Sequence, residues 1–196
     1  EMEVRPRTAV IVEEGGAFLS NYIYLSPVRL LQTNPVVYLR GEGAVARFNT
    51  VLVAPPGSFM DVGSRVFLAA ERTRAELIAR TVTTGGRIIN RGLLVGEKAG
   101  VKAHLECGGL LLASEGFIRA IPELEARVAG AELSHEAAVG KIAPEEIEYM
   151  MARGLDEDEA TATIVRGFLN VRIEGLPEEL ERQIDRALAV SKASAM

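Results

Sequence analysis

The chain has 196 residues, 48% of them hydrophobic, and a formal net charge of −5, which fits one ordinary domain or one domain with a small appendage. The negative charge and the scatter of basic residues argue against nucleic acid or an anionic membrane as the main partner. The single cysteine excludes an internal disulfide, and with no signal-like start the sequence predicts a cytoplasmic protein. No apolar run approaches the ~20 residues of a membrane-spanning helix.

The first part of the chain, up to Gly43, contains three short strand-like runs, which are rich in β-branched and aromatic residues and are separated by glycine and proline. These runs are Ala9–Val12, Asn21–Leu25 and Val36–Leu39. The chain starts at Glu1 without an initiator methionine, which leaves open a start inside a longer protein.

A loose repeat follows, in which small residues recur at short and irregular intervals. Its marks are Ala44, Ser58, Ala75, Gly86, Gly100 and Gly116. Each mark precedes a short strand-like run, and several of these runs are followed by a second short apolar run. No helical period interrupts this region, so alternating βα units are not expected. A sandwich, a barrel and a parallel β-helix stay open, and the β-helix is favoured because its corners need small residues and tolerate irregular spacing.

Helical signals begin after Gly140. Pro144 suits the first helical position, Gly154 ends that helix, and Asp156 with Glu159 forms a capping box for a second one. Pro177 opens a third amphipathic helix. The sequence therefore predicts a β core over residues 1–140 and a C-terminal helical domain over residues 141–196.

Cys107 is the first candidate functional residue. On a strand it shares a face with Leu105, while Glu106 points the other way. Gly108 and Gly109 follow it, and we expect them to leave its surroundings open to close approach. A buried hydrophobic role is the ordinary alternative for a lone cysteine, whereas a nearby imidazolium would lower its pKa and create a reactive or metal-binding thiolate.

His135 and Glu136 lie where the strands give way to helices. Imidazole, carboxylate and thiolate all bind iron or zinc, so Cys107, His135 and Glu136 form a candidate ligand set. Cys107 with His135 as its base is an alternative nucleophile. His104 is an odd number of positions from Cys107 and is expected to face away, as a surface or hydrogen-bonded histidine. No phosphate-binding loop is present, so the chain is not expected to hydrolyse ATP itself.

These residues lie in a region that resembles a known family. The run LSHEAAVGKIAPEEIEYMMARGLDEDEATATIVRGF, with AHLECGGLLLAS upstream and PELEARVAGAELSHEA between them, is similar to the C-terminal part of the SufB/SufD family. Members of that family are core scaffold proteins of the sulfur-mobilisation system that assembles iron–sulfur clusters. The similarity runs from about His104 to Phe168, and the helix-rich N-terminal region of longer members has no counterpart.

The resemblance implies a right-handed parallel β-helix followed by a small helical domain. It also implies a non-enzymatic scaffold that carries a transient iron–sulfur cluster, or iron, on Cys107, His135 and Glu136. Family members form homo- or heterodimers with one another through their β-helices, and their helical ends bind SufC, a separate ABC-type ATPase. A second cysteine that transfers sulfur in the family has no counterpart here, because Cys107 is the only one.

Two roles within the family stay open. Cys107 and Glu136 together favour a B-like scaffold subunit, whereas a D-like structural pairing subunit would have no cluster ligands of its own. A third interpretation, a β-helix enzyme acting on carbohydrate or acyl donors, is not favoured, because aromatic residues are scarce and the strands lack clustered carboxylates.

Overall fold

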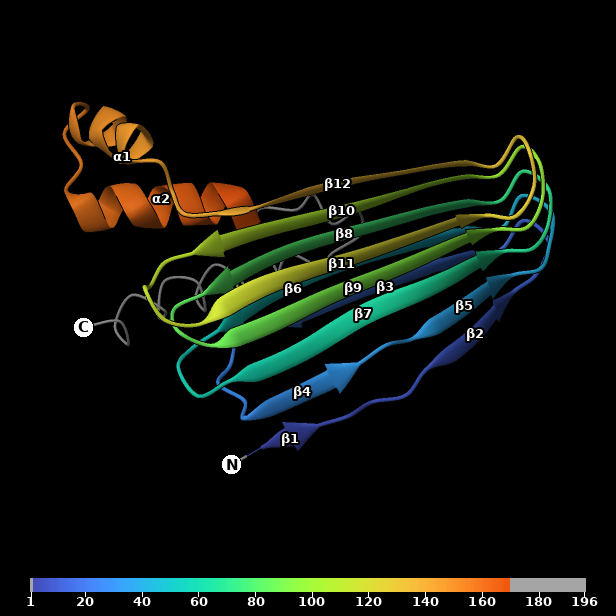
Figure 1. The fold of residues 1–196 in the computed structure, drawn as a ribbon, viewed down its shortest axis with the longest axis horizontal. Coiled ribbons are helices and arrows are strands. Elements are labelled where there is room, and N and C mark those ends of the chain that lie inside the picture. Colours follow the sequence, from blue (N-terminus) through green and yellow to red (C-terminus); the bar gives the residue numbers. More distant parts are fainter. Residues whose placement is uncertain (1, 170–196) are drawn as a thin grey trace.

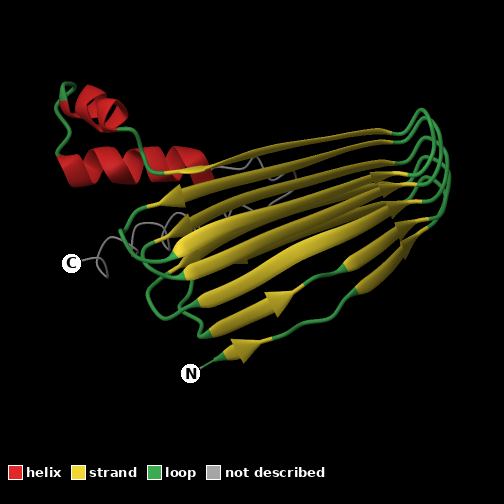
Figure 2. Ribbon diagram, viewed as in Figure 1, coloured by secondary structure: helices red, strands yellow, loops and turns green. Residues whose placement is uncertain are grey.

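The computed structural model describes residues 2–169, and within that range the chain forms a stack of parallel strands followed by two helices (Figures 1 and 2). The predicted helix at Pro177 lies outside the described residues. The helices are α1 (Pro144–Met151) and α2 (Glu157–Leu169). The early strands are β1 (Glu3–Val4), β2 (Ala9–Val12), β3 (Ala17–Tyr24), β4 (Leu30–Thr33) and β5 (Val36–Leu39). The later ones are β6 (Val45–Ala54), β7 (Phe59–Leu68), β8 (Arg74–Thr83), β9 (Arg87–Gly96), β10 (Lys102–Leu111), β11 (Phe117–Ala126) and β12 (Glu132–Gly140).

The strands form two sheets, and within each sheet the paired neighbouring strands are all parallel. Sheet B is β12-β10-β8-β6-β3. In sheet A, β7 pairs with β9 on one side, and on the other side with β4 along its first half and β5 along its second half. From β6 onward, consecutive strands alternate between the sheets, so each coil contributes one rung to each sheet. The predicted parallel β-helix is confirmed, because these consecutive strands lie in different sheets and each pairs in parallel with the strand one coil away. The hairpin pairing of antiparallel sandwiches and barrels is not formed in residues 2–169.

The length of one coil follows from residues that are aligned on neighbouring rungs. Asn21 and Asn49 have a sequence separation of 28, and His104 and Ser134 have one of 30. Each turn that precedes a sheet B strand contains one residue with positive φ, and these residues recur with a similar period. These residues are Gly15, Gly43, Arg72, Gly100 and Gly130. The short intervals between small residues in the sequence are therefore half-coils.

The sequence suggests two short apolar runs in succession at several places. In the structure, such a pair of runs forms one long strand. VARF and Thr50–Val53, for example, both lie within β6. The alternation of buried and exposed residues holds in the first half of β6, whereas the last four residues are all buried. The second half is buried on both faces because α2 lies on the outer face of sheet B, with Leu169 packed among Val51, Val53 and Val82.

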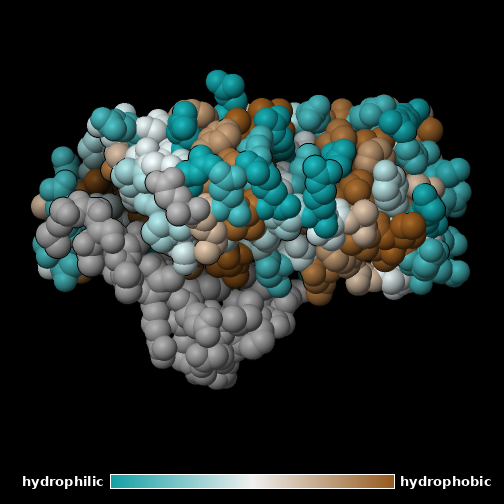
Figure 3. All heavy atoms as spheres, turned by 90° about the horizontal axis from the view of Figure 1, so that it is seen from below, coloured by the Kyte–Doolittle hydropathy of each residue, from teal (hydrophilic) through white to brown (hydrophobic). Residues whose placement is uncertain are grey.

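The core lies between the two sheets. Its largest fully buried side chains include Leu31, Leu39, Leu52, Met60, Leu68, Ile88 and Leu94. Seen from below, apolar side chains also reach the surface among hydrophilic ones (Figure 3), and the most exposed large apolar residues of the first rungs are Met2, Ile11 and Leu19. Neither helix of the described range has the length and apolar character needed to cross a membrane.

The helix boundaries follow the local signals in the sequence. Pro144 is the first residue of α1, and Gly154, at a φ of 97°, follows its last turn. The predicted capping box is confirmed, because the Glu159 N–H donates to Asp156 Oδ1 at 2.7 Å and the Asp156 N–H donates to Glu159 Oε2 at 3.1 Å. Both helices lie beside the carboxyl ends of the sheet B strands (Figure 1).

Candidate functional site

The last rungs of the solenoid, β11 and β12, form an open end. β12 pairs with β10 and β11 pairs with β9. Within residues 2–169, each of these two strands has its second edge unpaired. Backbone N–H and C=O groups along such an edge are available to another strand. The candidate residues His135 and Glu136 both lie on β12, at this edge.

The register between β10 and β12 fixes which candidates share a face. Leu105 lies opposite His135, Glu106 opposite Glu136, and Cys107 opposite Ala137. Leu105 and Cys107 are 2% and 1% exposed, so they point into the core, whereas the half-buried Glu106 points outward to Arg80. The predicted alternation of Leu105, Glu106 and Cys107 is confirmed. By the same register, His135 has the inward position and Glu136 the outward one, and both are exposed.

The three predicted ligands therefore do not form a closed set in a single chain. Cys107 and His135 have inward positions that are out of register on neighbouring strands, and Glu136 belongs to the opposite face. Nowhere in the described part of the chain do three His, Cys, Asp or Glu side chains gather closely enough to hold a metal ion. The assignment of these residues as ligands stays a prediction, and it requires donors from elsewhere.

Cys107 is a protonated thiol in these surroundings. Burial, followed by the nearby Glu106 carboxylate, raises the pKa of Cys107 from an ordinary 9.0 to about 11, and the Arg80 guanidinium acts in the lowering direction. Cys107 is therefore not activated as a nucleophile within this chain at neutral pH.

Gly108 and Gly109 do not leave open space around Cys107, so that expectation was wrong. A Cβ atom on Gly108 would lie 3.0 Å from Cε2 of Phe168, and one on Gly109 would lie 3.1 Å from Cγ2 of Ile118. These glycines instead admit a ring from α2 on the outer face and a side chain from sheet A on the inner face. The sequence could not reveal this, because both contacts depend on how separate elements pack against each other.

His104 lies on the outer face of sheet B, as predicted, and its Nδ1 is 2.9 Å from Ser134 Oγ. It borders a groove of about 770 Å³ across the amino ends of the sheet B strands. The acids of this groove are paired with cations, because Lys102 Nζ lies 2.8 Å from Glu132 Oε2 and Arg47 Nε lies 3.7 Å from Glu76 Oε2. A pair of free catalytic carboxylates, which the carbohydrate-enzyme interpretation needs, is therefore not formed here.

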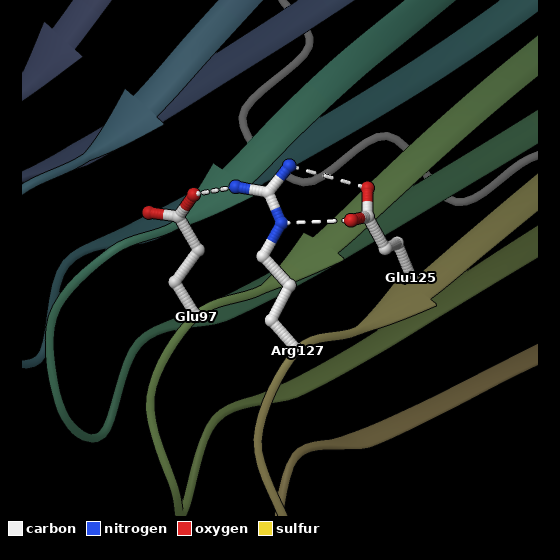
Figure 4. A network of polar contacts seen from close by, with 3 residues as sticks. All are labelled: Glu97, Glu125 and Arg127. Carbon is white, nitrogen blue, oxygen red and sulfur yellow. Dashed lines mark hydrogen bonds and ion pairs between the residues drawn. The ribbon is translucent and has the colours of Figure 1, made fainter.

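An ion network fastens the turn that follows β11 (Figure 4). Arg127 donates from Nε to Glu125 Oε1 at 2.8 Å and from Nη1 to Glu97 Oε1 at 2.5 Å. Glu97 follows β9 and Glu125 lies in β11, so Arg127 joins the last rung of sheet A to the one below it. The hydrogen bond to Arg127 lowers the pKa of Glu125.

Sequence reasoning missed Arg80, the residue that engages Glu106 from β8. Its Nη2 donates to Glu106 Oε1 at 2.5 Å, across a sequence separation of 26. This separation is close to one coil, so a correct coil period would have brought the two residues onto neighbouring rungs.

The fold and the open end define the class of protein: a parallel β-helix with an appended helical pair, whose last rung presents a histidine and a carboxylate one strand away from a buried cysteine. Residues 6–168 match the family described as SUF system FeS cluster assembly, SufBD core domain. The chain therefore belongs to the SufBD family of iron–sulfur cluster assembly proteins, and the resemblance found in the sequence is confirmed.

Named relatives agree with this family. An iron–sulfur cluster assembly SufBD family protein of Archaeoglobus fulgidus is 56% identical over 191 residues, covering 97% of this chain and 52% of the relative. Another, from Methanothermobacter thermautotrophicus strain Delta H, is 45% identical over 97% of this chain and 47% of its own length. A Staphylococcus epidermidis member is 32% identical over 82% of this chain and 35% of its own. The chain thus spans about half the length, or less, of these curated relatives.

Proposed function

We propose that this chain is a non-catalytic scaffold subunit on which an iron–sulfur cluster is assembled as cargo. Cys107 supplies a sulfur donor, His135 an imidazole ligand and Glu136 a hard oxygen donor for iron. The observation that carries this proposal is the exposure of His135 and Glu136 on the open edge of β12, one strand away from Cys107. An edge strand presents side chains and backbone to a second molecule at the same time.

The partner at the open end is a second SufB/SufD family member, identical or different. The donor set of a single chain is incomplete, since the inward Cys107 and His135 and the outward Glu136 of the described chain do not converge. A second β-helix, joined edge to edge, would add donors and cover His135. It would also bury the exposed apolar residues Leu124 and Val139 of the last rungs.

The second partner is an ABC-type ATPase of the SufC kind, bound through the C-terminal helices. α1 buries none of its side chains, and Tyr149 and Met151 are 57% and 44% exposed. An uncovered apolar helix face is the kind of surface that binds another protein. ATP hydrolysis is then the partner's activity.

Anaerobic reconstitution tests the proposal. The chain is mixed with ferrous iron and sulfide, alone, with a second family member, and with the ATPase, and cluster formation is followed by visible absorbance. Cys107→Ser, His135→Ala and Glu136→Gln should each reduce the cluster formed by the complex. His104→Ala and Glu132→Gln are matched controls, because these residues lie on the same two strands but outside the proposed set. Equal losses in the controls would overturn the assignment.

The D-like alternative, a pairing subunit without its own cluster ligands, is favoured by one observation: Cys107 is buried, and this burial raises the pKa of its thiol. A Cys107→Ser complex that still assembles a full cluster, together with a thiol that stays unreactive toward iodoacetamide in the complex, would establish this alternative.

A further inference from the structure

Arg80 lies at the border between the covered and uncovered halves of the outer face of sheet B. In β8 it is aligned with Val51 of β6 and with Gly108 of β10. Val51 lies under α2, in the cluster that contains Leu169, whereas Glu106, two positions before Gly108, lies just outside that cover. Arg80 therefore contacts both the helical part of the chain and the strand that contains Cys107.

The contacts of Arg80 join three elements. Its Nη2 donates to Glu106 Oε1 of β10 at 2.5 Å, and its guanidinium carbon lies 5.7 Å from the centroid of the Phe168 ring in α2. A Cβ atom on Gly108 would lie 3.0 Å from that ring and 3.2 Å from Arg80 Nη1. A Cβ atom here would press tightly on both the ring and the guanidinium, so β8, β10 and α2 meet in one packed junction.

The partner of Arg80 has a like-charged neighbour. Glu106 lies directly opposite Glu136 on the outer face of neighbouring rungs. Two carboxylates in this arrangement repel each other, and a divalent cation could bridge them. The Arg80 side chain engages that of Glu106, whereas the carboxylate of Glu136 makes no hydrogen bond or ion pair with the described residues. Of these two carboxylates, Glu106 is therefore engaged by an arginine, and Glu136 has no such partner among the described residues.

We propose that Arg80 is a positioning residue with two linked effects. It occupies Glu106, so that Glu136 is the single free carboxylate of this pair in the described chain, and it stacks on Phe168, so that α2 is fastened to the strand next to the open end. The proposal rests on the proposed function only for the role of Glu136 as an iron donor. Displacement of α2 would withdraw one of the contacts that hold Arg80 on Glu106.

The test measures divalent-cation binding by calorimetry with Mn²⁺ and the hydrogen exchange of Glu157–Leu169 by mass spectrometry, both on the full chain. Arg80→Gln should tighten Mn²⁺ binding about tenfold, because it frees Glu106 to bridge a cation with Glu136. It should also speed exchange in α2. Glu106→Gln added to Arg80→Gln should return Mn²⁺ binding to the wild-type value and leave the fast exchange unchanged.

Two further variants separate the charge of Arg80 from its stacking. Arg80→Lys keeps the charge and should leave Mn²⁺ binding within about twofold of wild type, while α2 exchanges faster because the planar stack is lost. Phe168→Leu should speed α2 exchange and also tighten Mn²⁺ binding by about twofold, since the two effects are linked.

Arg91→Gln is the matched control. It breaks a similar ion pair on sheet A, in which Arg91 Nε donates to Asp61 Oδ1 at 2.6 Å. Unchanged Mn²⁺ binding in Arg80→Gln, or α2 exchange that rises equally in Arg91→Gln, would overturn the proposal. Neither Mn²⁺ binding nor α2 exchange needs a cluster. A failed reconstitution would therefore reject the scaffold role, while the positioning role of Arg80 would still be decided by these two measurements.

Discussion

His135 on β12 lies directly opposite Leu105 on β10, yet Leu105 is 2% exposed and His135 is exposed. The two residues have the same place in successive rungs, and only the rung differs. Leu105 is covered on both sides, whereas the described part of the chain places no strand beyond His135. An ionisable residue thus takes the position that an apolar residue fills inside the stack, which indicates a role outside the stability of the single chain.

His135→Leu should therefore leave the fold intact and remove function. We expect the free energy of unfolding to change by less than about 0.5 kcal/mol, as for other exposed positions, when measured by urea denaturation. Cluster reconstitution by the complex should fall sharply in the same variant. The reciprocal change Leu105→His is the control, and it should destabilise the chain by about 3 kcal/mol or more, since it places a polar ring in the core. A loss of about 2 kcal/mol in His135→Leu would instead show that His135 is structural.

The stability of the chain should fall between pH 9 and about pH 11 because of Cys107. Its pKa is raised in the folded state to about 11, while in the unfolded chain it is ordinary. Between these values the unfolded chain has released the thiol proton and the folded chain retains it, so rising pH favours unfolding. The contribution lost is about 2 to 3 kcal/mol.

Cys107→Ala isolates this effect from the lysines and tyrosines that titrate in the same range. In urea titrations, the unfolding free energy of wild type relative to that of Cys107→Ala should fall by about 2 to 3 kcal/mol from pH 8.5 to pH 11. Alkylation of native wild type by iodoacetamide should be slow at pH 8 and should accelerate toward pH 11. A pH-independent difference between the two proteins would contradict the raised pKa.

The features that sequence reasoning located correctly are local ones. The capping box of Asp156 and Glu159, the first helical position of Pro144 and the facing of Leu105, Glu106 and Cys107 each depend on residues within a few positions of one another. The parallel β-helix followed from small residues at turns together with the resemblance to a known family.

The features that sequence reasoning missed depend on contacts between residues that are far apart in the chain, such as those on strands one coil apart. The contact of Arg80 with Glu106 needs the period of a full coil, whereas the small residues in the sequence mark half-coils, because they precede strands of both sheets. The covering of Gly108 by Phe168 needs the docking of α2, which lies far downstream of the strand in the sequence. The burial of both faces at the end of β6 was missed for the same reason, because the element that covers the outer face comes from far downstream.

Gly92→Ala should destabilise the core beside Cys107. A Cβ atom on Gly92 would lie 2.6 Å from both Cδ atoms of Leu105, which is buried between the sheets. Leu105 cannot swing away without displacing its neighbours, so we expect a loss of about 1 to 3 kcal/mol in urea denaturation, as for other overpacked cores.

A double-mutant cycle with Leu105→Val gives the control. Leu105→Val alone should cost about 1 kcal/mol through the cavity that it leaves. Combined with Gly92→Ala it should cost clearly less than the sum of the single changes, because the new methyl group fills that space. Strict additivity would show that Gly92 and Leu105 are not in contact.

Arg72→Gly should stabilise the protein. Arg72 has a φ of 57° at a turn where the equivalent residues of other coils are glycines, including Gly43 and Gly100. A non-glycine residue in this region is strained by about 1 kcal/mol, which exceeds the small contribution of its exposed ion pair with Glu42. We expect the free energy of unfolding to rise by about 0.5 kcal/mol in urea titrations, and Glu42→Gln measures the ion pair separately. Arg74→Gly, in the adjoining strand, is the control and should lower the free energy of unfolding by about 1 kcal/mol. A loss of similar size in Arg72→Gly would mean that the turn is not strained.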